Sequence, residues 1–295
     1  MEANSIKQKD SKNKCEHSLN HRMKIDNIDN FYLCKNCGII IFNFNEDKYL
    51  YTLKPILYEG KTEIFPNDLF EQMRKEEFTP IDAEHAYNKN REKALKIFDE
   101  NCSYVTINDV ILYKALNFMD YIFIRLGNKN LKIKSITLYI INAIVFATEA
   151  YKNDEIGLNK FSVLDISYTI DELDIKRNEI RALKLLQYNL NKLGVYDVLV
   201  FLLHNGIVFD KELEDKSAEF CSFIYNYALK LFKDIIRSHI CLLYHTCQIA
   251  FSIVHLTRKK FDLNIKYFKI LKMLYNYKAS EYKECLGAVQ QIIDG

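Results

Sequence analysis

The most apolar stretch of the chain runs from Ile136 to Ala147 and contains only two polar residues, Thr137 and Asn142. A helix that is apolar on every face is buried on all sides by other helices, whereas a surface helix keeps one polar face. The stretch is also shorter than the roughly 20 apolar residues that cross a bilayer. It therefore predicts a core helix over residues 135–151 of an all-helical protein, and no membrane span.

Helical periodicity continues on both sides of this core helix. It predicts helices over residues 82–101, 109–125, 160–167 and 171–188. In the last of these we expect the inward side chains to be Ile175, Ile180, Leu183 and Leu186. The second half predicts five more helices, over residues 196–205, 215–232, 238–258, 265–275 and 279–293. The third helix is mostly apolar in both halves, which indicates a weak duplication of a five-helix unit.

Pro and Gly are scarce, with 3 and 8 in 295 residues, and so few helix breakers favour long helices with short connections. We therefore predict a mostly α protein with two tandem five-helix folds, over residues 81–193 and 194–295. A small zinc-binding β-ribbon over residues 15–45 and a linker over residues 46–80 are predicted to precede them. Residues 1–14 are polar and are predicted to form a disordered tail.

Two groups of potential metal ligands lie near the N-terminus, Cys15-Glu-His17 and Cys34-Lys-Asn-Cys37-Gly. A Cys-x-x-Cys turn directs two thiolates at one point, and short apolar strands over residues 31–33 and 39–42 flank it as in a zinc ribbon. We therefore predict a structural Zn²⁺ held by Cys15, His17, Cys34 and Cys37. His21 is an alternative to His17, because one residue between Cys15 and His17 is a tight spacing. The competing interpretation is a loop with metal-free thiols.

The charges of the chain nearly balance, and a formal net charge of +2 argues against a protein held to nucleic acid by charge alone. We find no phosphate-cradling Gly-rich loop and no Ser-His-Asp order, so we expect no enzyme activity. The first ten residues lack the apolar core of a signal peptide, and most of the 8 Cys lie singly in helical patterns. These features predict a reducing intracellular compartment, nucleus or cytoplasm.

The string Lys114-Ala-Leu-Asn-Phe-Met-Asp-Tyr-Ile-Phe123 resembles the second helix of the cyclin box. Counting back without gaps places Arg91 on the Arg of the first-helix motif Met-Arg-Ala-Ile-Leu of that family. The resemblance implies that Arg91 pairs with Asp120. A charge held between two packed helices needs a partner, and the guanidinium fork suits a carboxylate. The alternative is two unrelated surface charges.

Three further strings extend the resemblance to residues 82–293. They are the end of the central helix, the segment from Arg177 to Leu190, and the segment from Tyr275 to Leu286, which are similar to later helices of the two cyclin folds. In cyclins a Lys late in the third helix and a Glu in the fifth bind the kinase partner, and Glu179 stands at the position of that Glu. Glu149 stands at the position of the Lys and reverses its charge, while Lys152 lies nearly one turn further on.

The resemblance implies a cyclin-like regulatory subunit that binds a cyclin-dependent protein kinase. The reversed charge at Glu149 favours an alternative, a cyclin-fold scaffold within a multiprotein assembly. Asn90, Ala94 and Ile97 replace the Met, Leu and Trp of the first-helix motif, so we expect the peptide-docking patch of cyclins to be lost. A third interpretation is a transcription factor of the TFIIB family, which also combines a zinc ribbon with two cyclin folds, but the low net charge argues against it.

Overall fold

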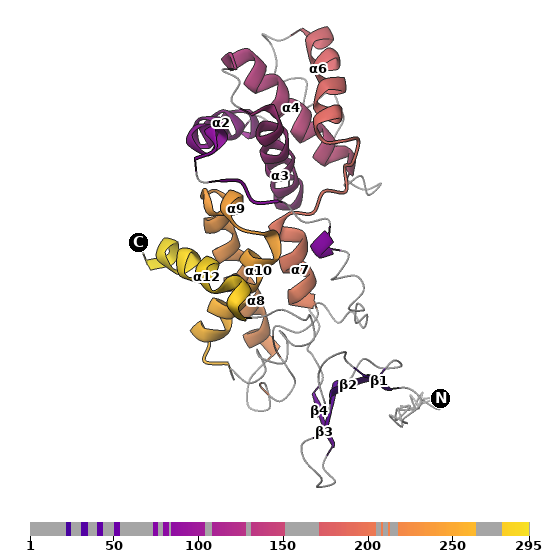
Figure 1. Cartoon of the computed structure of the whole chain (residues 1–295), viewed down its shortest axis with the longest axis vertical. Coiled ribbons are helices and arrows are strands. Elements are labelled where there is room, and N and C mark those ends of the chain that lie inside the picture. Colours follow the sequence, from indigo (N-terminus) through magenta and orange to yellow (C-terminus); the bar gives the residue numbers. More distant parts are fainter. Residues whose placement is uncertain are drawn as a thin grey trace, which may run out of the picture.

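The computed structural model describes residues 22–24, 31–34, 40–43, 50–53, 73–75, 79–82, 84–103, 108–127, 131–150, 171–204, 208, 212, 218–263 and 279–294. The helices form two groups, which lie one above the other in Figure 1. We call α2, α3, α4 and α6 the first unit, and α7, α8, α9, α10 and α12 the second unit. The tail over residues 1–14 and the helices predicted over residues 160–167 and 265–275 lie outside the described residues.

The first unit contains α2 (Ala86–Cys102), α3 (Asp109–Leu126), α4 (Ile133–Ala150) and α6 (Glu172–Leu185). Their ends carry the expected local signals. The Asn108 side chain accepts a hydrogen bond from the backbone N–H of Ile111 at the start of α3. Gly127 ends α3 with a φ of 63°, a left-handed conformation that glycine adopts without strain.

The predicted core helix is α4, which contacts α2, α3 and α6. Its buried residues include Ile140, Ile141, Ala143, Ile144 and Ala147, and these side chains belong to the main hydrophobic core. Among the described helices, α4 is the one long and apolar enough to cross a membrane by composition, with a mean hydropathy of 1.4. Its contacts with three helices explain that composition, because a helix that is surrounded by other helices is apolar on most of its faces.

The second unit contains α7 (Val195–His204), α8 (Ala218–Ile236), α9 (Ile240–Leu243), α10 (Thr246–Lys260) and α12 (Ala279–Asp294). Here α10 is the central helix, since it contacts α7, α8 and α12. Each unit is therefore arranged around a helix from its third predicted position, α4 in the first unit and α10 in the second.

One predicted helix of the second unit is wrong in its extent. The helix expected over residues 238–258 is broken between α9 and α10, where Tyr244 has extended backbone angles of φ −125° and ψ 154°. The break is stabilised by local polar contacts, because the backbone N–H of His245 donates to Oε1 of Gln248 at 2.9 Å. The carbonyl of Leu242 accepts from the backbone N–H of Ile81 at 2.9 Å, which joins α9 to the start of the first unit.

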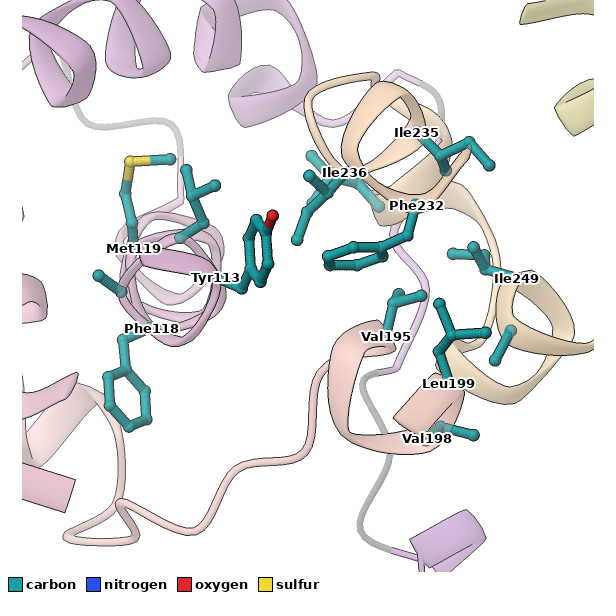
Figure 2. Close-up of a cluster of buried hydrophobic side chains, with 14 of the residues drawn as sticks. Tyr113, Phe118, Met119, Val195, Val198, Leu199, Phe232, Ile235, Ile236 and Ile249 are labelled. Carbon is teal, nitrogen blue, oxygen red and sulfur yellow. The ribbon is translucent and has the colours of Figure 1, made fainter. Parts of the chain in front are cut away.

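The two units share one hydrophobic core. Figure 2 shows Tyr113 of α3 directed toward Phe232 and Ile236 near the end of α8. The rings of Tyr113 and Phe232 meet edge to face with centroids 4.7 Å apart, and Tyr196 of α7 completes the cluster at 5.2 Å from Tyr113. Aromatic pairs at these distances stabilise an interface beyond the area they bury.

An antiparallel sheet precedes the helices, with strand order β1-β2-β3-β4. Its strands are β1 (Arg22–Lys24), β2 (Phe31–Cys34), β3 (Ile40–Asn43) and β4 (Leu50–Leu53). The predicted hairpin corresponds to β2 and β3, with Phe31 opposite Phe42, whereas β1 and β4 are not predicted by the sequence. Cys34 is the last residue of β2, and Cys15, His17, His21 and Cys37 lie outside the described residues.

Candidate protein-interaction site

The helix α6 is held against α4 by its first turn and by its apolar inner side. The Asp171 carboxylate accepts a hydrogen bond from the backbone N–H of Leu173 at 3.0 Å and caps the helix. Lys134 at the start of α4 forms an ion pair with Asp174 at 2.7 Å. Ile175, Ala182 and Leu186 are buried on the inner side. The orientation of α6 is therefore fixed, and its opposite side faces solvent.

The outer side of α6 carries two large apolar side chains. Leu173 is 57% exposed and Ile180 is 56% exposed. The prediction that Ile180 points inward is therefore wrong, although it holds for Ile175 and Leu186. At 100° per residue Ile180 falls on the same line as Leu173, about half a turn away from Ile175 and Ala182. The helix has two apolar lines on opposite sides, and the core covers only one of them.

Two of the three predicted partner-binding residues lie on the neighbouring helices α6 and α4. Glu179 is half-buried in the middle of α6, and Glu149 is half-buried in the last turn of α4. Lys152 lies outside the described residues. The contacts of α4 with α6 place the two helices that bear the acidic residues side by side. The described part of the chain contains no group of three or more His, Cys, Asp or Glu side chains that could hold a metal ion.

Arg91 and Asp120 are brought together between α2 and α3. Nε of Arg91 donates to Oδ1 of Asp120 at 3.0 Å, and Nη2 donates to Oδ2 at 2.8 Å, so the contact is bidentate. The hydroxyl of Tyr87 donates to Oδ1 of the same carboxylate at 2.7 Å. The Arg91 residue is only 2% exposed. Each charge thus has an opposite partner in a position where an unpaired one would be strongly destabilising.

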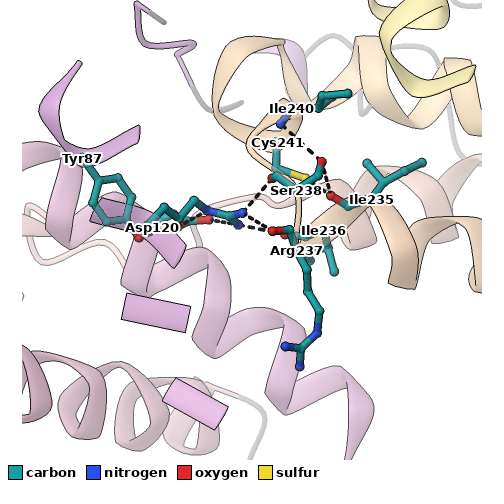
Figure 3. Close-up of polar contacts among 9 residues, drawn as sticks. Tyr87, Asp120, Ile235, Ile236, Arg237, Ser238, Ile240 and Cys241 are labelled. Carbon is teal, nitrogen blue, oxygen red and sulfur yellow. Dashed lines mark hydrogen bonds and ion pairs between the residues drawn. The ribbon is translucent and has the colours of Figure 1, made fainter. Parts of the chain in front are cut away.

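The same guanidinium also binds the second unit. Its remaining N–H groups donate to the main-chain carbonyls of Ile236, Arg237 and Ser238 at 2.8, 2.9 and 2.7 Å. Figure 3 shows these carbonyls, at the end of α8, facing Asp120 and Tyr87 of the first unit. The last carbonyls of a helix lack intrahelical partners and carry partial negative charge, so a buried cation is favourable there. Arg91 therefore joins the two units as well as α2 and α3.

Burial and neighbouring charges shift the titration of the groups around Arg91. Burial, and then the Asp120 carboxylate, raise the pKa of Tyr87 well above its usual value. Burial lowers the pKa of Arg91, but the Asp120 carboxylate outweighs it and the net shift is upward. Burial raises the pKa of the Cys241 thiol to about 12, although the Arg91 cation opposes the shift. The cluster accordingly holds one ion pair and neutral Tyr and Cys side chains near pH 7.

Lys114 is a second buried cation at the junction, and the sequence does not predict the groups that it contacts. Nζ of Lys114 donates to the carbonyl of Lys192 at 2.6 Å and lies 3.6 Å from a carboxylate oxygen of Asp197 on α7. The amide of Asn117 donates to the same Lys192 carbonyl at 3.2 Å. Both carbonyl contacts, like those of Arg91, involve main-chain atoms, for which the sequence gives no signal.

The region of the expected docking patch is a cavity of about 110 Å³. Asn90, Lys93 and Ala94 of α2 line one side of it, and Phe123, Leu126 and Leu131 are among its other lining residues. Asn90 and Lys93 are exposed and Ala94 is buried. Two polar side chains, Asn90 and Lys93, therefore lie among mostly apolar lining residues, and the loss of the peptide-docking patch stays a prediction.

No protein-family model matches the sequence, and no curated protein sequence is significantly similar to it. The structure is similar to a viral cyclin from herpesvirus saimiri, with a TM-score of 0.54 and 10% identity over 77% of this chain and 96% of that one. A chain of the yeast TFIIK (Kin28/Ccl1/Tfb3) complex matches with a TM-score of 0.45 and 14% identity over 72% of this chain and 94% of that one. A chain of the yeast RNA polymerase II CTD kinase CTDK-1 complex matches with a TM-score of 0.44 and 14% identity over 80% of this chain and 72% of that one.

The likeness to the viral cyclin shows the class of fold. The described helices of this chain have the cyclin fold, although at 10% identity few residues are shared with that protein. The sequence-based prediction of a cyclin fold is therefore confirmed.

Proposed function

We propose that this chain is a cyclin-like regulatory subunit that binds a protein kinase of the cyclin-dependent type. The observation that carries the proposal is the exposed apolar line of Leu173 and Ile180 on α6, in a chain with the cyclin fold. The resemblance assigns kinase contact to this helix through Glu179. Large exposed apolar side chains beside a predicted contact residue mark an interaction surface.

In this proposal the chain carries out no chemistry itself. It would hold the regulatory helix of the kinase in the active position, where a Lys–Glu ion pair of the kinase grips ATP. The contacts between the units suit that role, because Arg91 and Lys114 of the first unit donate to the main-chain carbonyls of Arg237 and Lys192. An intracellular location follows from the proposal.

Affinity purification of the full chain, followed by identification of the bound proteins, tests the proposal. We expect a protein kinase with the wild type, and its loss with Ile180→Asp or Glu179→Ala. Phe223→Asp is the matched control, since Phe223 is 63% exposed on α8 of the second unit. Kinase binding that survives Ile180→Asp but is lost with Phe223→Asp would place the contact elsewhere.

A scaffold role is the second candidate, and the acidic residue Glu149 favours it. An acidic group at the position where cyclins have a Lys would repel a partner surface built for that Lys. Under the kinase proposal, Glu149→Lys weakens the complex and a charge swap on the kinase restores it. Under the scaffold candidate no kinase is captured, and neither Glu149→Lys nor Glu179→Ala changes the set of bound proteins.

We propose further that the N-terminal module holds one structural Zn²⁺ through Cys15, Cys34, Cys37 and a His. The support is that Cys34 ends β2, and Cys37 follows within the segment that connects β2 to β3. Arg22 pairs with Cys34 across β1 and β2, and His21 directly precedes Arg22 in the sequence, so His21 stays a candidate for the fourth ligand beside His17.

Zinc content of the purified chain tests this module. We expect one equivalent of zinc, because metal binding and folding are coupled in such small sites. His17→Ala and His21→Ala, compared side by side, identify the fourth ligand by the loss of bound metal. Zinc-free protein purified without chelator would overturn the assignment.

A further inference from the structure

The outer side of α6 has a strongly uneven charge. Its exposed side chains, among those the structure describes, are Leu173, Lys176, Arg177, Ile180, Arg181 and Lys184. Every exposed charge among them is basic, although the whole chain has a net charge of only +2. Basic charge is therefore concentrated on the side of the helix that the core leaves uncovered.

Three of these cations repel one another within the helix. Arg177 and Arg181 are four residues apart, and Arg181 and Lys184 are three apart, so both pairs share a face and are destabilising. No acidic residue lies three or four positions from Arg181 or Lys184. The one acidic residue at that distance from Arg177 is Asp174, which is already paired with Lys134 of α4.

The apolar and basic residues form a regular arrangement along the helix. Leu173 and Ile180 are seven residues apart, about 10 Å along the axis and close to one straight line. Arg177, Arg181 and Lys184 lie beside that line, displaced toward one flank by the 100° rotation per residue. A straight apolar seam with charges along its edge is the arrangement by which paired helices select their partners.

We propose that this face of α6 binds an amphipathic helix of the partner protein whose apolar seam is flanked by acidic residues. Acidic side chains would offset the repulsion among Arg177, Arg181 and Lys184, while the seam covers Leu173 and Ile180. This inference rests on the proposed function, because it takes the partner helix to belong to the kinase. It adds that the three basic residues Arg177, Arg181 and Lys184 determine which kinase helix can bind.

Synthetic helices provide a direct test with the full chain. The probe is a peptide about three heptads long with a Leu and Ile seam and Glu at the flanking positions. A second peptide has the same seam with Lys in place of each Glu. Binding to the wild type is measured by fluorescence anisotropy at about 20 mM and about 150 mM salt, where screening differs strongly. We expect the Glu peptide to bind at least about tenfold more tightly than the Lys peptide at low salt, and this preference to shrink at the higher salt.

Charge reversal and a matched control separate a specific seam from general attraction. Arg181→Glu combined with Lys184→Glu is expected to reverse the preference between the peptides. Lys259→Glu combined with Lys260→Glu removes two exposed cations at the end of α10 and is expected to leave it unchanged. Ile180→Ala is expected to weaken the binding of both peptides about equally. Equal binding of the two peptides to the wild type, or equal effects of the two double variants, would overturn the proposal.

Measuring kinase capture by the same variants distinguishes this inference from the proposed function. If a kinase co-purifies and the double change at Arg181 and Lys184 does not reduce its capture, the inference fails while kinase binding stands. If the peptides behave as expected and no kinase co-purifies, the acidic-helix inference stands and the kinase proposal fails. Circular dichroism of each variant checks that the helices are intact.

Discussion

The junction between the two units and the outer face of α6 both depend on basic side chains, and they use them in opposite ways. At the junction, Arg91 is 2% exposed and its N–H groups bind the Asp120 carboxylate and three main-chain carbonyls. On α6, Arg181 and Lys184 are exposed and stand next to like charges. The N–H groups of Arg91 all have acceptors within the chain. Arg181 and Lys184 have no acidic residue three or four positions away on their own helix.

The difference shows how burial decides what a cation contributes. A buried cation must be paired inside the protein, so its partners become part of the fold and their loss is costly. An exposed cation costs little to leave in water, so it is available to a partner and contributes mainly to the choice of that partner. Stability is therefore expected to depend on the junction, and recognition on α6.

The largest expected effect on stability is at Asp120. Asp120→Ala leaves the Arg91 guanidinium buried without a carboxylate and removes the acceptor of the Tyr87 hydroxyl. We expect the free energy of unfolding to fall by about 3 to 5 kcal/mol. Thermal unfolding followed by circular dichroism should show a melting temperature lower by on the order of 10 °C. An unchanged melting temperature would mean that the buried pair between α2 and α3 does not stabilise the fold.

A smaller loss of stability is expected when Lys114 at the same junction is changed. Lys114→Met keeps most of the side-chain volume and removes the donor to the Lys192 carbonyl. We expect a loss of about 1 to 2 kcal/mol in the free energy of unfolding, measured by urea denaturation. Lys233→Met is the control, because Lys233 bridges the units to Asp109 at 2.6 Å but both side chains are more than half exposed. Equal losses in the two variants would contradict the importance given to burial.

The two regions also differ in how far the sequence predicts them. The apolar stretch of α4 predicts a core helix, because side-chain type and helical period carry that information. The pair of Arg91 and Asp120 is implied by the resemblance to cyclins. The carbonyls of residues 236–238 are invisible to such reasoning, since every residue has one. The sequence predicts the wrong side for Ile180, because α6 has two apolar lines and only the neighbouring helices decide which one is buried. The break before α10 depends on a side-chain cap at Gln248 rather than on Pro or Gly.

The exposed ion pair at the junction should matter least for holding the units together. Arg237 and Asp99 are 2.7 Å apart, nearly the distance between Arg91 and Asp120, but their side chains are 45% and 46% exposed. Solvent screening and side-chain entropy reduce such a pair to between zero and about 1 kcal/mol. Asp99→Ala is therefore expected to change the urea midpoint only slightly, and added salt should remove even that change. A loss as large as that of Asp120→Ala would show that distance, not burial, sets the contribution.

The effect on stability that is expected on α6 is small and has the opposite sign. Arg181→Glu replaces two repulsive pairs with attractive ones, to Arg177 four residues before and to Lys184 three residues after. Each such pair is worth about 0.2 to 0.5 kcal/mol, so the variant is expected to unfold at slightly higher urea than the wild type. The same change should weaken binding of the acidic helix, since it removes one of the cations beside Leu173 and Ile180. A stabilising substitution that reduces binding is the behaviour of a site kept for recognition at the expense of stability. If Arg181→Glu instead destabilises the chain, then Arg181 has a structural role, and the contrast between the junction and α6 would no longer hold.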